Sequence, residues 1–285
     1  MSETGIPNPR ELGWFRFKLG EFECTAVWDG TLYQPYEGIY PNADFDEIKA
    51  LMKKYGLPED NIPMDLNVLV VNTGSDIILV DPGMGTGDIF GDGMGHMPAN
   101  LVAAGIDPDD VSLVLISHLH PDHAWGLVDG KGAPIFDKAR LGVTKLDWDY
   151  WTDEAKLDYD DHRASWVKGT LESVAPYRDR MVWVEDDAEI VPGAWAKLTP
   201  GHSPGHSAFL FQSAGDSLMS LGDCTHHAVY EVQHPEWYYS LDYDTIPDLA
   251  VESRRMIYNL VVEGKHQAMG YHFPWPGIGR IERKD

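Results

Sequence analysis

The sequence predicts a mixed α/β fold, in which two β-sheets form one sandwich covered by helices. Two β-rich blocks, each followed by a helical stretch, occur along the 285 residues. Sheets and helices of this kind bury their apolar faces by packing in layers. Hydrophobic residues make up 43% of the chain, which is ample for a core. No internal repeat or Ser/Gly linker divides the chain, so we expect a single domain over residues 1–285.

The first block contains strand-like runs, a loop and a helix. The runs "WFRFKLG" and "FECTAVWDG" alternate side chains and end in glycine, which predicts a hairpin over 14–30. "MDLNVLVVNTG" and "SDIILVDPG" predict a second hairpin over 64–83, turning at "NTGS". Between them we expect a projecting loop over 31–45. Residues 98–105 predict a short helix, and the apolar run 111–118 predicts a strand buried on both faces.

The second block begins after an acidic, helical stretch over 145–175. Residues 245–263 form the strongest helix candidate and lead to a final strand and a proline- and glycine-bounded loop over 266–279. The strand-like runs of the block are "RMVWVE", "AWAKLTPG", "SAFLFQS" and "SLMSLGD". The apolar residues expected near one face of the 245–263 helix are Ile246, Leu249, Met256, Leu260 and Val261.

Charge and composition exclude several classes of partner. The chain has 22 basic and 46 acidic side chains, a net charge of −24, which disfavours nucleic acid and anionic membrane surfaces. No run approaches the roughly 20 apolar residues of a membrane helix. The first 15 residues lack the pattern of a signal peptide. The only cysteines, Cys24 and Cys224, are far apart in sequence. We therefore expect a cytoplasmic protein without a disulfide framework.

The stretch "HLHPDH", residues 118–123, indicates a metal site. It follows an apolar strand, so its backbone is free to turn. His118 and His120 are two residues apart and can converge on one cation, while Asp122 and His123 can serve a second. Imidazole combined with carboxylate suits zinc first, with iron, cobalt or manganese as substitutes.

Further donors occur at the ends of other predicted strands, where loops gather. "TPGHSPGH" supplies His202 and His206, "LGDCTHH" supplies Asp223, and "GYHFPWPG" supplies His272. Each alone would more often be structural, but together they can complete the coordination of two ions.

With these motifs in this order, the sequence resembles the metallo-β-lactamase-fold hydrolase superfamily over most of its length. The resemblance implies a four-layer αββα sandwich with the metal site at one edge, and an early Asp, Asp81 in "LVDPG", that orients ligands. In "TPGHSPGH" it implies the second His as ligand, which leaves His202 structural. The implied ligands of the two divalent ions are His118, His120 and His206 for the first, Asp122, His123 and His272 for the second, and Asp223 as a bridge.

This ligand set implies a hydrolase in which a hydroxide shared by two metals attacks a carbonyl or phosphoryl centre. Asp122 and Asp223 are expected to take part, and Asp223 could accept a proton. "GDCTHHAVYEVQHPEWYYSLDYD" resembles the methyl parathion hydrolase branch, and "TPGHSPGH" resembles the N-acyl-homoserine lactonases. Those lactonases often have Tyr where His226 stands. His226 is therefore either a hydrogen-bond donor or general acid, or an ordinary residue of a polar loop.

Aromatic residues near the motifs favour a neutral, moderately hydrophobic small-molecule substrate. A lactone or ester is expected, with organophosphate triesters and a non-catalytic metal-binding scaffold as alternatives. Resemblance alone raises a homodimer as an expectation. Trp125, directly after the ligands, could line the pocket or pack beneath the next helix. The aromatic residues predicted for the pocket are Trp125, Trp148, Trp151, Phe273 and Trp275.

Overall fold

The computed structural model describes residues 9–87, 89–240 and 243–284. The start of the chain, residues 1–8, on which part of the signal-peptide prediction rests, lies outside the described residues. Within the described ranges, no helix is both long and apolar enough to cross a bilayer.

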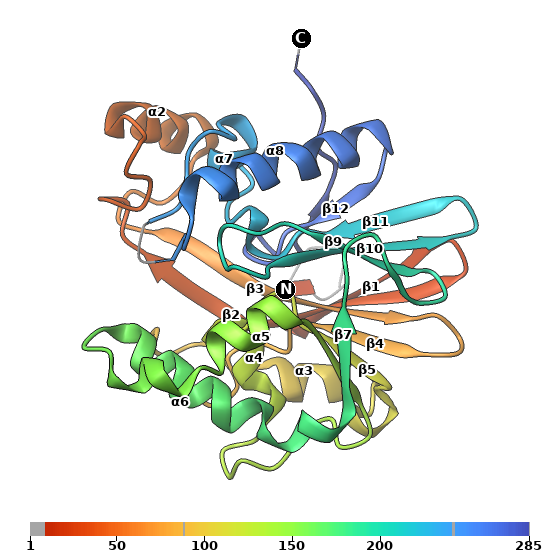
Figure 1. Cartoon of the computed structure of the whole chain (residues 1–285). Helices are drawn as coiled ribbons and strands as arrows, with labels where there is room; N and C mark the ends of the chain where they lie inside the picture. Colours follow the sequence, from red (N-terminus) through yellow and green to blue (C-terminus); the bar gives the residue numbers. More distant parts are fainter. Residues whose placement is uncertain (1–8, 88, 241–242, 285) are drawn as a thin grey trace.

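Two sheets face each other in the middle of the molecule (Figure 1). The first has the order β1-β2-β3-β4-β5-β6-β7, and the second has the order β13-β12-β11-β10-β9-β8. The strands of the first sheet are β1 (Trp14–Leu19), β2 (Phe22–Gln34), β3 (Ile62–Asn72), β4 (Ile77–Val80), β5 (Leu113–Leu115), β6 (Arg140–Thr144) and β7 (Met181–Val184). Those of the second are β8 (Glu189–Val191), β9 (Ala194–Leu198), β10 (Ser207–Ser213), β11 (Asp216–Ser220), β12 (Gln267–Met269) and β13 (Ile278–Gly279).

Helices cover the outer face of each sheet (Figure 1). The layers therefore run helix, sheet, sheet, helix, which confirms the predicted αββα sandwich. Beside the first sheet lie α3 (Met97–Ala103), α4 (Pro121–Ala124), α5 (Lys145–Trp151) and α6 (His162–Val174). On the side of the second sheet lie α7 (Tyr230–Gln233) and α8 (Pro247–Glu263). The helix α2 (Phe45–Tyr55) follows β2 and buries Ile48, Leu51 and Met52 in the same core as residues of β2 and β3, while α1 (Pro9–Leu12) precedes β1.

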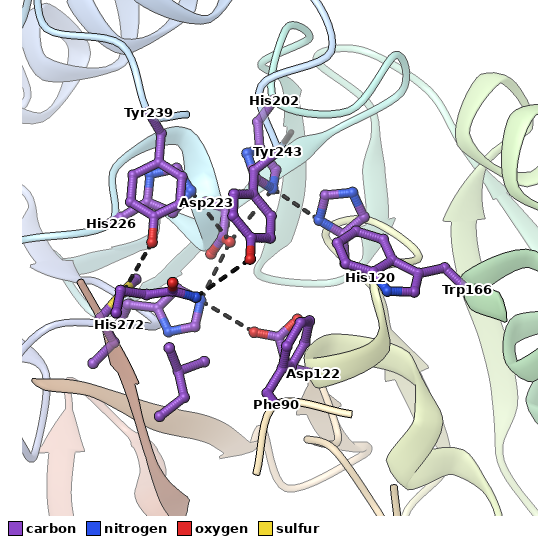
Figure 2. Close-up of a pocket in the computed structure, with 13 residues that line it drawn as sticks. Phe90, His120, Asp122, Trp166, His202, Asp223, His226, Tyr239, Tyr243 and His272 are labelled. Atoms are coloured by element: carbon purple, nitrogen blue, oxygen red, sulfur yellow. Dashed lines mark hydrogen bonds and ion pairs between the residues drawn. The ribbon is translucent and has the colours of Figure 1, made fainter. Parts of the chain in front are cut away.

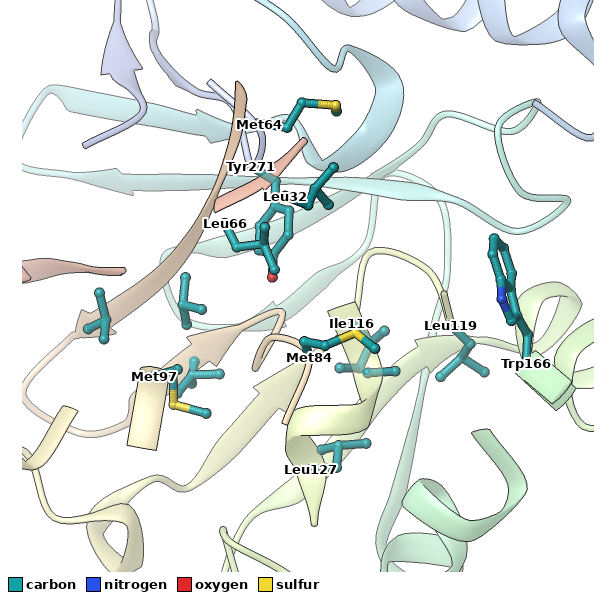
Figure 3. Packing of buried hydrophobic residues seen from close by; sticks show 14 of the residues in the cluster. Leu32, Met64, Leu66, Met84, Met97, Ile116, Leu119, Leu127, Trp166 and Tyr271 are labelled. Atoms are coloured by element: carbon teal, nitrogen blue, oxygen red, sulfur yellow. The ribbon is translucent and has the colours of Figure 1, made fainter. Parts of the chain in front are cut away.

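Side-chain alternation along β3 explains the layering. Val68 and Val70 pack into the core between the first sheet and its helices, part of which Figure 3 shows. Leu69 and Val71 point the other way, into the core between the sheets. Because successive residues of a strand face opposite sides, an apolar run of this kind is buried on both faces.

Both predicted hairpins are confirmed, since β1 pairs with β2 and β3 with β4 in antiparallel register. The expected loop over 31–45 is only partly correct, because β2 continues to Gln34. The helix α2 was not expected from the sequence. Asp44 caps its N-terminus by accepting from the Asp46 N–H, and Gly56 ends it with φ +62°.

The buried face of α8 differs from the predicted one. Of the five residues expected there only Val261 is buried, and Ile246 and Leu260 are exposed. The actual face includes Ser253 and Arg254, polar residues that a search for apolar periodicity passes over. Their burial is compatible with the fold because both form hydrogen bonds.

Candidate metal centre

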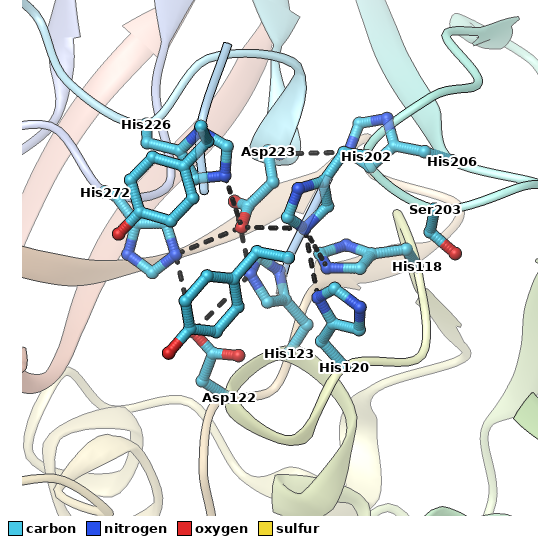
Figure 4. A network of polar contacts seen from close by, with 12 residues as sticks. His118, His120, Asp122, His123, His202, Ser203, His206, Asp223, His226 and His272 are labelled. Atoms are coloured by element: carbon cyan, nitrogen blue, oxygen red, sulfur yellow. Dashed lines mark hydrogen bonds and ion pairs between the residues drawn. The ribbon is translucent and has the colours of Figure 1, made fainter. Parts of the chain in front are cut away.

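The predicted donors converge at the edge of the sandwich where several strands end (Figure 4). His118 and His120 follow β5, and Asp122 and His123 lie in the short helix α4. The remaining donors follow strands of the second sheet. His202 follows β9, Asp223 follows β11 and His272 follows β12. All of these side chains are buried.

The first donor group consists of His118, His120 and His202. Nε2 of His202 lies 3.1 Å from Nε2 of His118 and 3.0 Å from Nδ1 of His120. Burial holds the pKa of His118 and of His120 well below the usual histidine value and lowers that of His202 to about 3. Three neutral imidazoles with converging nitrogens can bind one divalent cation.

The second donor group consists of Asp122, His123 and His272, whose ligand atoms also lie together. Nε2 of His272 is 3.4 Å from Oδ2 of Asp122, and Nε2 of His123 is 3.8 Å from the same oxygen. Burial lowers the pKa of His272, but Asp223 and Asp122 outweigh it and raise it to about 9. The buried carboxylates therefore require positive charge opposite them, from a proton or a cation.

Asp223 lies between the two groups, as expected for a bridging residue. Its Oδ1 is 3.2 Å from Nε2 of His123, and its Oδ2 is 3.3 Å from Nε2 of His272 and 3.5 Å from Nε2 of His202. Nε2 of His123 and Oδ1 of Asp223 are buried without a hydrogen bond of good geometry. Unpaired polar atoms of this kind, inside a His/Asp cluster, fit the donor set of a divalent-metal centre.

The structure places the two histidines of the "TPGHSPGH" motif in different surroundings. Nε2 of His202, which was expected to be structural, lies beside His118 and His120, whereas the ring of His206, the expected ligand, lies 5.1 Å from that of His118 between centroids. Nε2 of His206 accepts the backbone N–H of Asp223 at 2.9 Å, so Nδ1 carries the proton and donates to Oγ1 of Thr199 at 2.7 Å. Both nitrogens of His206 are thus occupied by protein atoms, and the residue holds Asp223 in place.

Asp81 has the orienting position that the resemblance implied. Its two oxygens accept from the N–H and the hydroxyl of Ser117 at 2.7 and 2.8 Å, and Oδ2 lies 3.1 Å from Nδ1 of His123. A hydrogen bond at Nδ1 leaves Nε2 directed toward the donor cluster.

His226 also faces the centre, with Nε2 3.5 Å from Oδ2 of Asp223. Its ring stacks on Tyr239, with ring centroids 3.9 Å apart. Nδ1 lies 3.1 Å from Oε1 of Glu231, which pairs in turn with Arg254 at 2.8 Å. His226 is thus buried, contacts Glu231 through Nδ1 and has Nε2 on the side of the donor cluster.

A small cavity opens over the donors (Figure 2). It contains His120, Asp122, His202, Asp223, His226 and His272, and none of the described residues that line it is Lys or Arg. Its other walls are apolar, aromatic or amide side chains: Leu32, Gln34, Met64, Phe90, Trp166, Tyr239 and Tyr243.

None of the five aromatic residues predicted for the pocket lines this cavity. Trp125 packs on α6, where a Cβ on Gly169 would lie 2.2 Å from its ring, and its Nε1 donates to Thr170 at 3.4 Å. Trp151 comes nearest. The centroid of its ring lies 4.8 Å from that of His120, and it lines an adjoining cavity.

The other three predicted pocket residues lie away from the site. Trp148 packs on Trp183, Phe273 packs between the second sheet and α8, and Trp275 packs against the core between the sheets. Proximity in sequence to a metal ligand therefore did not identify the residues that line the cavity. Of the aromatic residues that the sequence places near the motifs, Tyr239 does line the cavity.

Comparison with known proteins agrees with this fold and donor set. The family described as "Metallo-beta-lactamase superfamily" matches residues 63–239. The chain belongs to this superfamily.

Among curated relatives, an N-acyl homoserine lactonase of Bacillus thuringiensis is 33% identical over 123 residues, which is 42% of each chain. One from Bacillus cereus is 30% identical over 121 residues, 42% of this chain and 41% of the relative. These alignments span less than half of the relatives' length.

Two solved structures are similar over nearly the whole chain. AidC, described as a dizinc quorum-quenching lactonase in complex with a product N-hexanoyl-L-homoserine, has a TM-score of 0.87 and 28% identity, covering 95% of this chain and 94% of AidC. The hydrolase AbOPH has a TM-score of 0.86 and 28% identity, covering 96% of this chain and 94% of AbOPH.

Proposed function

We propose that this chain is a dinuclear, metal-dependent lactonase that opens the ring of neutral, moderately hydrophobic lactones, with N-acyl-homoserine lactones as the first candidates. The observation that carries the proposal is the pair of buried donor groups joined by Asp223 beneath an apolar and aromatic cavity. The similarity to lactonases supports the substrate class.

The donors would hold two ions, with His118, His120 and His202 on one, Asp122, His123 and His272 on the other, and Asp223 between them. Zinc suits this mixture of imidazole and carboxylate. When bound, two such ions supply an activated water and polarise a carbonyl oxygen.

The protein side chains account for the rest of the reaction. The walls of the cavity hold an uncharged acyl group and exclude bulk water. Addition of hydroxide to the lactone carbonyl and cleavage of the ring C–O bond leave an alkoxide that must take up a proton. His226, whose Nδ1–H is held by Glu231, would take a proton on Nε2 from the attacking water and pass it to the alkoxide. The products are the free hydroxyl and the carboxylate of one hydroxy acid, and the proton of the new carboxyl group passes to solvent.

A substrate panel tests the proposal on enzyme stripped with a chelator and reloaded with zinc. The panel contains acyl-homoserine lactones, simple lactones, aryl esters and paraoxon-type triesters. We expect kcat/KM for acyl-homoserine lactones to exceed that of the other classes by about tenfold or more, and to disappear after metal removal. Higher kcat/KM for the triesters would instead support an organophosphate hydrolase. A folded, zinc-loaded protein without turnover would support a metal-binding scaffold.

A further inference from the structure

Asp147 is a buried carboxylate that does not belong to the donor set but joins the two loops carrying the first donor group. It lies on α5, and its side chain is inaccessible to solvent. Oδ2 accepts from the N–H of Leu119 at 2.6 Å, and Leu119 stands between His118 and His120. Oδ1 accepts from the hydroxyl of Ser203, the residue after His202.

The contact between α5 and the His202 loop is close and specific. The N–H of Gly205 also reaches Oδ1 of Asp147, at 3.3 Å. Thr144, the N-cap of α5, donates its hydroxyl to the carbonyl of Gly205 at 2.7 Å. A Cβ on Gly205 would lie 2.2 Å from Oγ1 of Thr144 and 2.3 Å from the Asp147 nitrogen. The loop can therefore approach the helix this closely only with glycine at that position.

Ser203 connects the same carboxylate to the aromatic wall beside His120. Its hydroxyl oxygen accepts from Nε1 of Trp151 at 2.9 Å while its hydrogen is given to Asp147. The Trp151 ring in turn contacts the His120 ring edge-on. Asp147 thus binds the main chain between His118 and His120 on one side, and on the other side it accepts from Ser203, which is itself hydrogen-bonded to Trp151.

A purely packing role would not require a charge at this position. Burial of a carboxylate costs free energy unless hydrogen bonds compensate for the lost water. Burial raises the pKa of Asp147 to about 6, although Ser203, Leu119 and Gly205 oppose the rise by donating to the carboxyl group. Three hydrogen-bond donors reach this carboxylate, one from the His118–His120 loop and two from the His202 loop. These hydrogen bonds fix both loops relative to α5.

We propose that Asp147 is a positioning residue that sets the separation of the His202 loop from the His118–His120 loop and so determines the affinity of the first donor group for its cation. This inference rests on the metal site of the proposed function. It does not make Asp147 a ligand, because its oxygens are directed to main-chain and hydroxyl donors.

The test is the zinc affinity of Asp147→Asn. The asparagine amide has one acceptor oxygen, whereas both carboxylate oxygens of Asp147 accept hydrogen bonds. At least one of the three groups that donate to Asp147 therefore loses its acceptor. We expect one of two zinc ions to bind about 10- to 100-fold more weakly, as for other residues that orient metal ligands. The other ion should be affected less than about threefold. Stepwise competition with a chromophoric chelator measures both constants, and saturating zinc should restore kcat.

Asp149→Asn is the matched control. Asp149 lies on the same helix but is half-exposed and pairs with Lys145 at the surface. This variant should retain both wild-type zinc affinities. Ser203→Ala provides a milder change if Asp147→Asn does not fold, since it removes one donor and leaves the contacts of Leu119 and Gly205. It should weaken the same ion by several-fold.

Thermal unfolding of the zinc-free proteins distinguishes positioning from stability alone. If Asp147→Asn and Ser203→Ala lower the Tm but leave both zinc affinities at the wild-type values, the inference is wrong and the proposed function stands. If the wild-type chain binds no zinc, the proposed function and the inference fail together. Selective weakening of one ion supports both.

Discussion

Nδ1 of His226 lies 3.1 Å from Oε1 of Glu231, and the same carboxylate receives the backbone N–H groups of His226 and His227 at 2.5 and 2.9 Å. Arg254 of α8 completes the group by pairing with Glu231. The loop after Asp223 is thereby folded around one buried carboxylate. This arrangement leaves Nε2 of His226 as the atom that faces Asp223 and the cavity.

Replacement of His226 by Ala should lower kcat for lactone opening by about 100-fold, within the usual range for a general acid. KM and zinc content should change little, because His226 is not part of either donor group. Steady-state kinetics and metal analysis measure these quantities. His227→Ala is the control, since His227 packs on Tyr230 and lies outside the cavity lining. Equal losses of kcat in the two variants would contradict a specific role for His226.

Glu231→Gln should reduce stability in a pH-dependent manner. Burial would raise the pKa of Glu231, but Arg254 and His226 outweigh it and lower the pKa from 4.5 to about 2. A lowered folded-state pKa means that the ionised group stabilises the fold above pH 4.5, and that this contribution is lost as the pH falls from 4.5 toward 2. We expect a loss of about 3 kcal/mol at pH 7 and about half of that at pH 3.

Denaturant unfolding of wild type and Glu231→Gln at the two pH values measures this difference. Glu23→Gln serves as the control, because Glu23 pairs with Lys18 at the exposed edge of the first sheet. Its effect should be small at both pH values. A Glu231→Gln effect of the same size at pH 7 and pH 3 would show that charge pairing with Arg254 is not its origin.

The two histidines of "TPGHSPGH" should differ in their effect on metal content. His202→Ala removes a member of the first donor group, so zinc content should fall from two ions per chain to about one. His206→Ala should retain both ions, because both ring nitrogens of His206 are engaged by Thr199 and Asp223. Elemental analysis after dialysis measures the difference. The opposite result, loss of an ion only in His206→Ala, would support His206 as the ligand, as the family resemblance implies.

Trp125→Phe and Trp166→Phe should separate packing from substrate selection. Trp125 packs on Gly169 and Thr170, so its replacement should cost about 1–2 kcal/mol of stability without changing the order of preferred substrates. Trp166 lines the cavity, so its replacement should change the kcat/KM ratio between long and short acyl chains. A changed ranking in Trp125→Phe would place that indole in the pocket.

The two cysteines should be inert in the folded protein. Cys24 and Cys224 are buried, and burial raises the pKa of each thiol to about 12. Because the thiolate is the reactive form, we expect no rapid reaction with Ellman's reagent at pH 8. Both thiols should react once denaturant is added. Rapid labelling of the native protein would show that one of the two sites opens.

The donors from residues 118–123 could be predicted because spacing along a loop is a local property. The different surroundings of His202 and His206 could not, because both residues occur in the same Ser/Gly/Pro-rich context. In the structure His206 directly precedes β10 and accepts the backbone N–H of Asp223, whereas His202 lies in the turn. Such a difference depends on how the turn docks on α5 and β11, which sequence spacing does not describe.

The pocket walls escaped prediction for a related reason. Trp125 is two residues from His123, but α4 is only four residues long, and its next turn directs Trp125 to α6. Trp166 lies far from every donor in sequence, yet its ring is 5.0 Å from that of His120. Tertiary packing determines such contacts, so a list of aromatic residues near motifs finds them only in part.

The cavity walls and the metal donors are supplied by different segments of the chain. Leu32 and Met64 come from β2 and β3, Phe90 from the loop before α3, and Trp166 from α6, and none of these segments contributes a donor. Leu32, Met64 and Phe90 can therefore be varied without removing a donor of the centre, whereas Trp166 also contacts the ring of His120. The first three sites are the natural positions for a directed-evolution library that varies substrate preference while the donor set is kept.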